Sequence, residues 1–153
     1  MHYSLECFEG AKAYRVSGDE DMANAFRIDK NFERMLTSHK QLGFPLFNVN
    51  EMVACTMDLL KMEKEWLPRA PLHSLYIRPT SICMDNRLGI SSVTKMKTFV
   101  VLSPVGPYYT KGFSPIKLYC DTKVVRAWPG GFGDKKVGGN YAPTLKTARS
   151  SRD

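Results

Sequence analysis

The pattern of apolar and polar positions predicts a β-hairpin near the start of the chain. Residues 11–16 (Ala-Lys-Ala-Tyr-Arg-Val) and 22–28 (Met-Ala-Asn-Ala-Phe-Arg-Ile) combine apolar with polar side chains and are rich in strand-compatible residues. The sequence Ser17-Gly18-Asp19-Glu20 lies between them and is typical of a turn. The chain is therefore expected to reverse direction at this turn.

Two helices are expected after the hairpin. Residues 30–42 carry apolar side chains at helical spacing, with Asp29 as the expected N-cap and Gly43 as the expected stop. A second helix is expected over residues 51–64, with Asn50 as its cap. Its apolar side chains occupy more than one face, which indicates a well-buried helix.

Strand-like segments dominate the rest of the chain. Residues 74–82 alternate, and residues 98–103 form a near-continuous apolar run that is typical of a central strand. Residues 116–120 and 124–128 predict two further short strands, and a helix is expected to begin at Thr144. This order of elements predicts a layered α+β domain, because it lacks the regular βαβ alternation of a Rossmann fold.

A glycine-rich run, residues 129–141 (Pro-Gly-Gly-Phe-Gly-Asp-Lys-Lys-Val-Gly-Gly-Asn-Tyr), is the most distinctive segment. Glycine lets backbone approach a ligand closely, but the run contains neither a dinucleotide-binding nor a Walker A pattern. A lysine held in such a loop can form a Schiff base if burial or a neighbouring cation lowers its pKa. Spacing alone does not decide between Lys135 and Lys136, and most lysines are ordinary surface residues.

Other candidate residues each have an ordinary interpretation. Strand periodicity places Tyr76 and Arg78 on the face opposite the apolar residues, where they could bind a carboxylate or form a solvated face. Arg34, in the first predicted helix, could hold a phosphate or make a surface ion pair. Tyr141 could donate a hydrogen bond to a ligand oxygen or simply pack.

Composition narrows the class of protein. A chain of 153 residues that is 43% hydrophobic can form one core, and its apolar runs fall far short of the roughly 20 residues of a membrane span. Residues 1–4 show no signal-peptide pattern. The formal charge of +7, concentrated in residues 121–153, suits a phosphate-bearing cofactor, carboxylate substrates, a solubilising surface or nucleic acid.

The cysteines do not predict a metal site. Cys7, Cys55, Cys83 and Cys120 are far apart and form no CxxC pair, and the chain has only three histidines. Scattered cysteines without a signal peptide fit a reducing compartment. We expect them to be mostly small core residues.

Several motifs together resemble the branched-chain-amino-acid aminotransferases of the eukaryotic type. They occur in the family's order and cover nearly the whole chain to Thr144. The segments that carry the resemblance are His2-Tyr3-Ser4-Leu5-Glu6-Cys7-Phe8-Glu9-Gly10-Ala11-Lys12-Ala13-Tyr14, Asn31-Phe32-Glu33-Arg34-Met35, Ser74-Leu75-Tyr76-Ile77-Arg78-Pro79, Ser103-Pro104-Val105-Gly106-Pro107-Tyr108-Tyr109, Arg126-Ala127-Trp128 and Lys136-Val137-Gly138-Gly139-Asn140-Tyr141-Ala142-Pro143-Thr144.

The resemblance implies a fold-type IV enzyme that uses pyridoxal 5′-phosphate (PLP). Lys136 matches the lysine that binds the cofactor covalently and moves the substrate proton, and Arg34 matches the arginine that binds the cofactor phosphate. Tyr141 matches the tyrosine that hydrogen-bonds the phenolate oxygen of PLP. The residues that match the substrate pocket are Tyr3, Phe8, Tyr76 and Arg78. The implied substrates are Leu, Ile and Val together with 2-oxoglutarate or glutamate.

The resemblance also implies a domain organisation. Residues 1–128 correspond to the N-terminal α/β domain, a mixed sheet with two main helices, without its start. Residues 129–153 correspond to the interdomain loop and the beginning of the second domain, which is otherwise absent. Since the second domain supplies the carboxylate that pairs with the pyridinium nitrogen, the chain is expected to be a weakly active or inactive fragment.

Alternative functions remain open at this level. The chain could be a non-catalytic module that dimerises with a full-length subunit, since the family's enzymes are typically homodimers. It could also belong to another fold-type IV enzyme, such as a D-amino acid transaminase or an aminodeoxychorismate lyase. No nucleic-acid or membrane partner is expected, and the expected location is cytoplasmic or mitochondrial rather than secreted.

Overall fold

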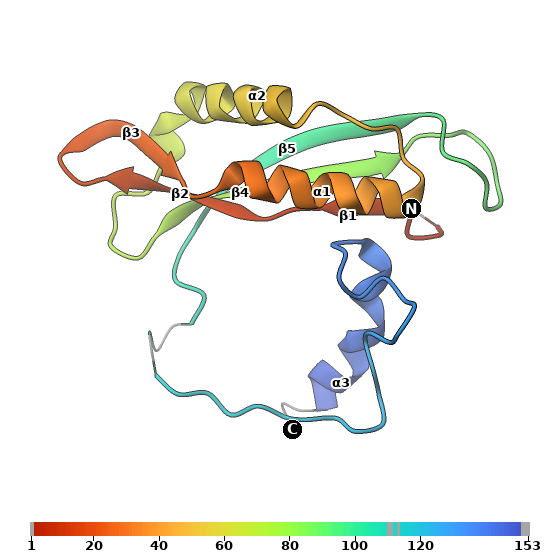
Figure 1. Cartoon of the computed structure of the whole chain (residues 1–153). Helices are drawn as coiled ribbons and strands as arrows, with labels where there is room; N and C mark the ends of the chain where they lie inside the picture. Colours follow the sequence, from red (N-terminus) through yellow and green to blue (C-terminus); the bar gives the residue numbers. More distant parts are fainter. Residues whose placement is uncertain (1, 110–111, 113, 151–153) are drawn as a thin grey trace.

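An antiparallel sheet of five strands forms the centre of the fold in the computed structural model, which describes residues 2–109, 112 and 114–150 (Figure 1). The sequence resemblance implied a mixed sheet, but every strand pairing in the described residues is antiparallel. The strands are β1 (Glu6–Phe8), β2 (Ala11–Val16), β3 (Asp19–Ala25), β4 (Ser74–Cys83) and β5 (Met96–Val105).

Strand β4 organises the sheet. One of its edges pairs with β5 along its whole length, and the other edge pairs first with β2 and then with β1. Strands β1 and β2 therefore lie end to end beside β4, with Glu9 and Gly10 in the interval between them. The Glu9 N–H donates to the Pro79 carbonyl at 2.8 Å, so the interval also stays attached to β4.

Two helices cover one face of this sheet (Figure 1). Helix α1 (Ile28–Leu42) buries Phe32 and Met35 completely, and these side chains join the core with Leu75 and Ile77 of β4. Helix α2 (Val49–Met62) packs beside α1 and leads into a short 3₁₀ turn, η1 (Lys64–Trp66). The predicted pair of helices is thus confirmed.

The ends of the helices differ from the predicted ones. The residue before α1 is Arg27, in a left-handed conformation, and the predicted cap Asp29 lies inside the first turn. Helix α2 is capped by the side chain of Asn48, which accepts from the backbone of Asn50 and Glu51, so the prediction of Asn50 as the cap was wrong. Gly43 ends α1 as predicted, with φ 64°.

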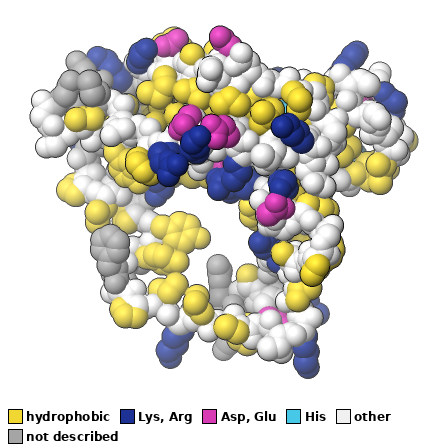
Figure 2. Space-filling model, viewed as in Figure 1, with side chains coloured by type: hydrophobic (Ala, Val, Ile, Leu, Met, Phe, Trp, Pro, Cys, Tyr) yellow, Lys and Arg dark blue, Asp and Glu magenta, His cyan; other side chains and the backbone are white. Residues whose placement is uncertain are grey.

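The strands predicted at 116–120 and 124–128 are wrong, because residues 114–128 form no strand. Leu118 is 80% exposed, and hydrophobic side chains are visible along this lower segment (Figure 2). The run at 98–103 does form a strand, but within the described residues β5 pairs only with β4, so it lies at an edge and not at the centre. The three-residue strand β1 was not predicted, because so short a segment carries no periodicity.

The glycine-rich segment returns to the sheet at β1. Val137 forms an isolated antiparallel bridge with Cys7, and both side chains are buried. Short 3₁₀ turns η2 (Gly138–Asn140) and η3 (Ala142–Thr144) follow, and then helix α3 (Leu145–Ser150), as expected near Thr144. No helix among the described residues is long and apolar enough to cross a membrane.

Candidate functional site

The backbone of Lys136 is held from two sides. Its N–H donates to Ser38 Oγ of α1 at 3.3 Å, and its carbonyl accepts from the Phe8 N–H of β1 at 3.1 Å. Ser38 is fully buried, and Val137, which follows Lys136 in the chain, is only 1% exposed. The helix and the sheet therefore fix the point from which the Lys136 side chain leaves.

The Lys136 amine lies among aromatic rings. Its Nζ is 4.7 Å from the ring centroid of Phe8 and 6.0 Å from that of Tyr141. Within the part of the chain that the structure describes, this amine makes no ion pair. Lys135, by contrast, forms an ion pair with Asp134, and this contact lowers the pKa of that carboxyl. The geometry therefore supports Lys136 over its neighbour as the reactive candidate.

Phe8 connects three of the predicted site residues. The ring of Tyr141 lies 5.1 Å away, centroid to centroid, and the guanidinium carbon of Arg78 lies 4.5 Å from the Phe8 centroid. Arg78 also donates from Nη2 to the Tyr76 hydroxyl at 2.7 Å. The Arg78 Nε is buried without a hydrogen-bond partner among the described residues, which leaves one donor for an acceptor brought by a ligand.

Arg34 is held by a buried carboxylate. It donates from Nε and from Nη2 to the two carboxylate oxygens of Glu9, each at 2.6 Å, and Glu9 is fully buried. The hydrogen bonds that Arg34 donates to Glu9 are the largest cause of its raised pKa, and Tyr141 adds a smaller electrostatic contribution. Because Glu9 directly follows Phe8 in the chain, the ion pair of Arg34 lies beside the contact between Phe8 and Tyr141.

A close approach of Gly10 to Tyr76 shapes the same region. A β-carbon on Gly10 would overlap the Tyr76 hydroxyl, so only glycine lets this phenol lie across the interval between β1 and β2. Sequence reasoning missed Gly10, Glu9 and Ser38 as residues of the site. The available signal was the unusual Glu9-Gly10 pair within an apolar stretch, but its meaning depends on a contact across the sheet.

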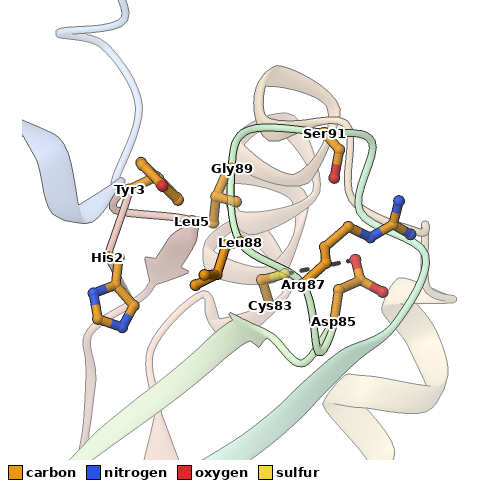
Figure 3. A pocket seen from close by; sticks show the side chains of 9 residues that line it. All are labelled: His2, Tyr3, Leu5, Cys83, Asp85, Arg87, Leu88, Gly89 and Ser91. Carbon is orange, nitrogen blue, oxygen red and sulfur yellow. Dashed lines mark hydrogen bonds between the residues drawn. The ribbon is translucent and has the colours of Figure 1, made fainter.

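Tyr3 lies apart from the other predicted residues. Its side chain is 48% exposed and lines a small pocket (Figure 3). Among the described residues, no ring contact or hydrogen bond joins Tyr3 to Phe8 or Lys136. Its assignment to the substrate pocket stays a prediction. The residues lining this pocket are His2, Tyr3, Leu5, Cys83, Asp85, Arg87, Leu88, Gly89 and Ser91.

The described residues contain no group of three or more His, Cys, Asp or Glu side chains that could hold a metal ion. Cys7 is fully buried as expected, and desolvation by burial raises its pKa to about 12, with smaller contributions from Glu9 and Glu6. Cys55 and Cys120 are exposed and Cys83 is half-buried, so the expectation that most of the cysteines are core residues was wrong.

The fold is shared with solved aminotransferase structures. The chain superposes on the Escherichia coli branched-chain amino acid aminotransferase with a TM-score of 0.71 and 23% identity, covering 98% of this chain and 49% of that one. The T.th. branched-chain amino acid aminotransferase, solved with pyridoxamine 5′-phosphate, gives a TM-score of 0.68 at 20% identity, covering 97% and 47%. These likenesses define the class of fold.

Sequence comparison identifies the family. The chain is 46% identical over 145 residues to a branched-chain-amino-acid aminotransferase of Dictyostelium discoideum, covering 95% of this chain and 38% of that protein. It is 44% identical over 146 residues to the cytosolic enzyme of Mus musculus, covering 95% and 37%. No family model matches the chain. Over 95% of its length the chain is therefore homologous to part of the branched-chain-amino-acid aminotransferases, which confirms the resemblance of its motifs.

The chain spans well under half the length of these curated relatives. A mitochondrial relative from Schizosaccharomyces pombe matches similarly, at 44% identity with 34% of its length covered. The relatives therefore include cytosolic and mitochondrial enzymes. Because most of each relative lies outside the match, the activity of the whole enzymes is not transferred to this chain by similarity alone.

Proposed function

We propose that this chain carries the lysine-bearing part of a PLP site for transamination between branched-chain amino acids and 2-oxoglutarate. The observation that carries the proposal is the placement of the Lys136 amine 4.7 Å from the Phe8 centroid, with its backbone anchored to α1 and β1. A lysine amine presented from a fixed backbone position is suited to forming a Schiff base with the carbonyl carbon of a cofactor.

The residues present fit this cofactor. Lys136 offers an amine without a carboxylate partner in the described residues, and Arg34 leaves part of its guanidinium exposed, with 48% of its side chain accessible. The Tyr141 hydroxyl would donate to the phenolate oxygen of PLP, and Arg34 would bind the phosphate. Bound PLP supplies the electron sink through which an amino group is exchanged for an oxo group.

The chain's own residues would then position the substrate and move a proton. Lys136 Nζ would take the proton from the substrate Cα and deliver it to C4′ of the cofactor. Phe8 would contact the branched aliphatic side chain, and Tyr76 with Arg78 would bind the side-chain carboxylate of glutamate. Tyr3, which matches a pocket residue in the sequence resemblance, would complete the wall of the substrate pocket.

Covalent labelling tests the cofactor assignment. The purified chain is incubated with PLP, reduced with borohydride and mapped by mass spectrometry. The label is expected on Lys136, to be lost in Lys136→Ala and to be retained in the matched control Lys135→Ala. A label on Lys135 alone would overturn the assignment.

Activity is a separate question, because the chain spans only about two fifths of its relatives. We expect little glutamate formation from leucine and 2-oxoglutarate by the isolated chain. Rapid glutamate formation would contradict this expectation. Co-purification with a full-length subunit without any PLP labelling would instead favour a non-catalytic dimerising module, and light scattering would give the oligomeric state.

A further inference from the structure

Glu9 is a buried acid that neither the sequence motifs nor the proposed chemistry assigns to a role. It is fully buried in the interval between β1 and β2. Its carboxylate accepts from Arg34 at two positions, from Asn31 Nδ2 at 3.1 Å and from the Gly10 N–H at 3.2 Å. Asn31 also donates to the Gly10 carbonyl at 3.1 Å. The carboxylate is therefore held in place by Asn31 and Gly10 as well as by Arg34.

The contact uses only one edge of the guanidinium. A guanidinium carries five N–H groups in one plane, and Glu9 occupies the edge formed by Nε and Nη2. The remaining N–H groups, on Nη1 and the far side of Nη2, make no hydrogen bond within the described residues. This second edge has the geometry for bidentate contact with a phosphate. Arg34 also lines an open depression of ≈ 450 Å³ together with Phe26, Arg27, Lys30 and Asn31.

We propose that Glu9 is a positioning residue, which fixes the plane of Arg34 so that its free edge is presented to the phosphate of a phosphate ester. The inference rests on the proposed function, since it takes Arg34 as the phosphate ligand. A site that needed only positive charge would be weakened by a buried carboxylate against its arginine. The Glu9 contact is therefore explained by orientation, because a long arginine side chain otherwise loses rotamer freedom on binding.

A purely structural role for Glu9 makes a different prediction. If Glu9 only stabilises the junction of β1 and β2, its replacement lowers stability but leaves unchanged the share of binding that the phosphate contributes. If it positions Arg34, its replacement lowers that share even though the site becomes more positive. The two roles are therefore separated by whether the share of binding contributed by the phosphate stays unchanged or falls.

The test compares Glu9→Gln with Glu33→Gln. Both remove one negative charge, and Glu33 lies next to Arg34 but pairs with Lys30 at the exposed surface. Absorbance titrations at one ionic strength give the affinities for PLP and for pyridoxal, and their ratio measures the contribution of the phosphate. We expect Glu9→Gln to lower this ratio by about tenfold or more and Glu33→Gln to leave it within about twofold.

Two further measurements keep the inference testable if Glu9→Gln folds poorly. In the unchanged chain, NMR is expected to show an Arg34 Nε–H that exchanges slowly with solvent; exchange at the rate of an exposed arginine would overturn the inference. Arg34→Lys keeps the positive charge but loses the planar guanidinium, and it is expected to lower the ratio of PLP to pyridoxal affinity as Glu9→Gln does. The variant that combines both substitutions is expected to show no further loss.

The outcomes separate this inference from the proposed function. An unchanged or increased ratio in Glu9→Gln, with PLP still attached to Lys136, overturns the role of Glu9 alone. Failure of the unchanged chain to attach PLP at Lys136 overturns the proposed function and this inference together.

Discussion

The layer formed by β1–β5, α1 and α2 and the segment of residues 114–128 both contain runs of apolar residues but differ in structure. In the layer, Leu75, Ile77 and Phe32 are completely buried. In the segment, Ile116 is 53% exposed and Leu118 is 80% exposed, although both lie in a run that predicts a strand. A strand needs a hydrogen-bonding neighbour, and β4 supplies one to β1, β2 and β5 but not to residues 114–128.

The largest expected effect separates the two regions directly. Ile77→Ala removes buried atoms from the centre of β4 and is expected to lower the free energy of unfolding by about 2–5 kcal/mol. Leu118→Ala, at an 80% exposed site, is expected to change it by less than about 0.5 kcal/mol. Urea denaturation of both variants measures the difference. Equal losses would show that residues 114–128 are packed in solution.

A glycine from the interval between β1 and β2 and a glycine from the glycine-rich run are expected to differ in how much stability an added β-carbon costs. Gly10→Ala is expected to cost about 1–3 kcal/mol, because its β-carbon would overlap the Tyr76 hydroxyl. At Gly139 the nearest atom to an added β-carbon is 3.6 Å away, an ordinary contact, so Gly139→Ala is expected to have a smaller effect on thermal unfolding. A Gly10→Ala variant as stable as the Gly139→Ala control would contradict the close approach.

The stability of the layer is expected to depend on pH through His39. This side chain is fully buried; its Nδ1 donates to the Pro45 carbonyl at 2.9 Å, and its Nε2 accepts from Ser81 Oγ at 2.8 Å. Desolvation by burial lowers the pKa of His39, so the folded state favours the neutral ring. The unfolded chain binds the proton more readily than the folded one. The stability that the neutral His39 contributes is therefore fully present above a pH of about 6.5 and is lost as the pH falls below it.

Urea unfolding at pH 7.5 and pH 5.5 measures this dependence. The expected loss at the lower pH is at most about 1.4 kcal/mol from this group. Comparison with His39→Gln isolates its share, because the amide does not titrate in this range. An equal pH dependence in the variant would show that other groups cause it.

The smallest expected effect concerns the start of α2. Asn48→Ala removes the acceptor for the Asn50 and Glu51 N–H groups and is expected to cost about 1 kcal/mol. Asn50→Ala lies one position inside the helix and is expected to change thermal stability very little. The reverse order of effects would restore the prediction made from the sequence and contradict the observed cap.

Much of the site could be predicted because its residues lie in recognisable motifs. Lys136, Arg34, Tyr141, Phe8, Tyr76 and Arg78 were all proposed from the sequence, and the structure brings them into one region. Glu9 was missed, because an acid in a strand-like stretch is usually solvated. Its burial depends on α1 placing Arg34 and Asn31 against the sheet. Tyr3 remains a prediction, since the structure places it in a separate pocket.

The sequence by itself determined the two main helices, strand β4 and the family resemblance. Periodicity identified α1 and α2, alternation identified β4, and ordered motifs identified the aminotransferase resemblance. Only the tertiary structure decided that β4 pairs along both edges, that residues 114–128 have no strand partner among the described residues, and that Glu9 holds Arg34. The physical reason is that periodicity reports which face of an element is apolar, whereas pairing and ion contacts depend on residues distant in the chain.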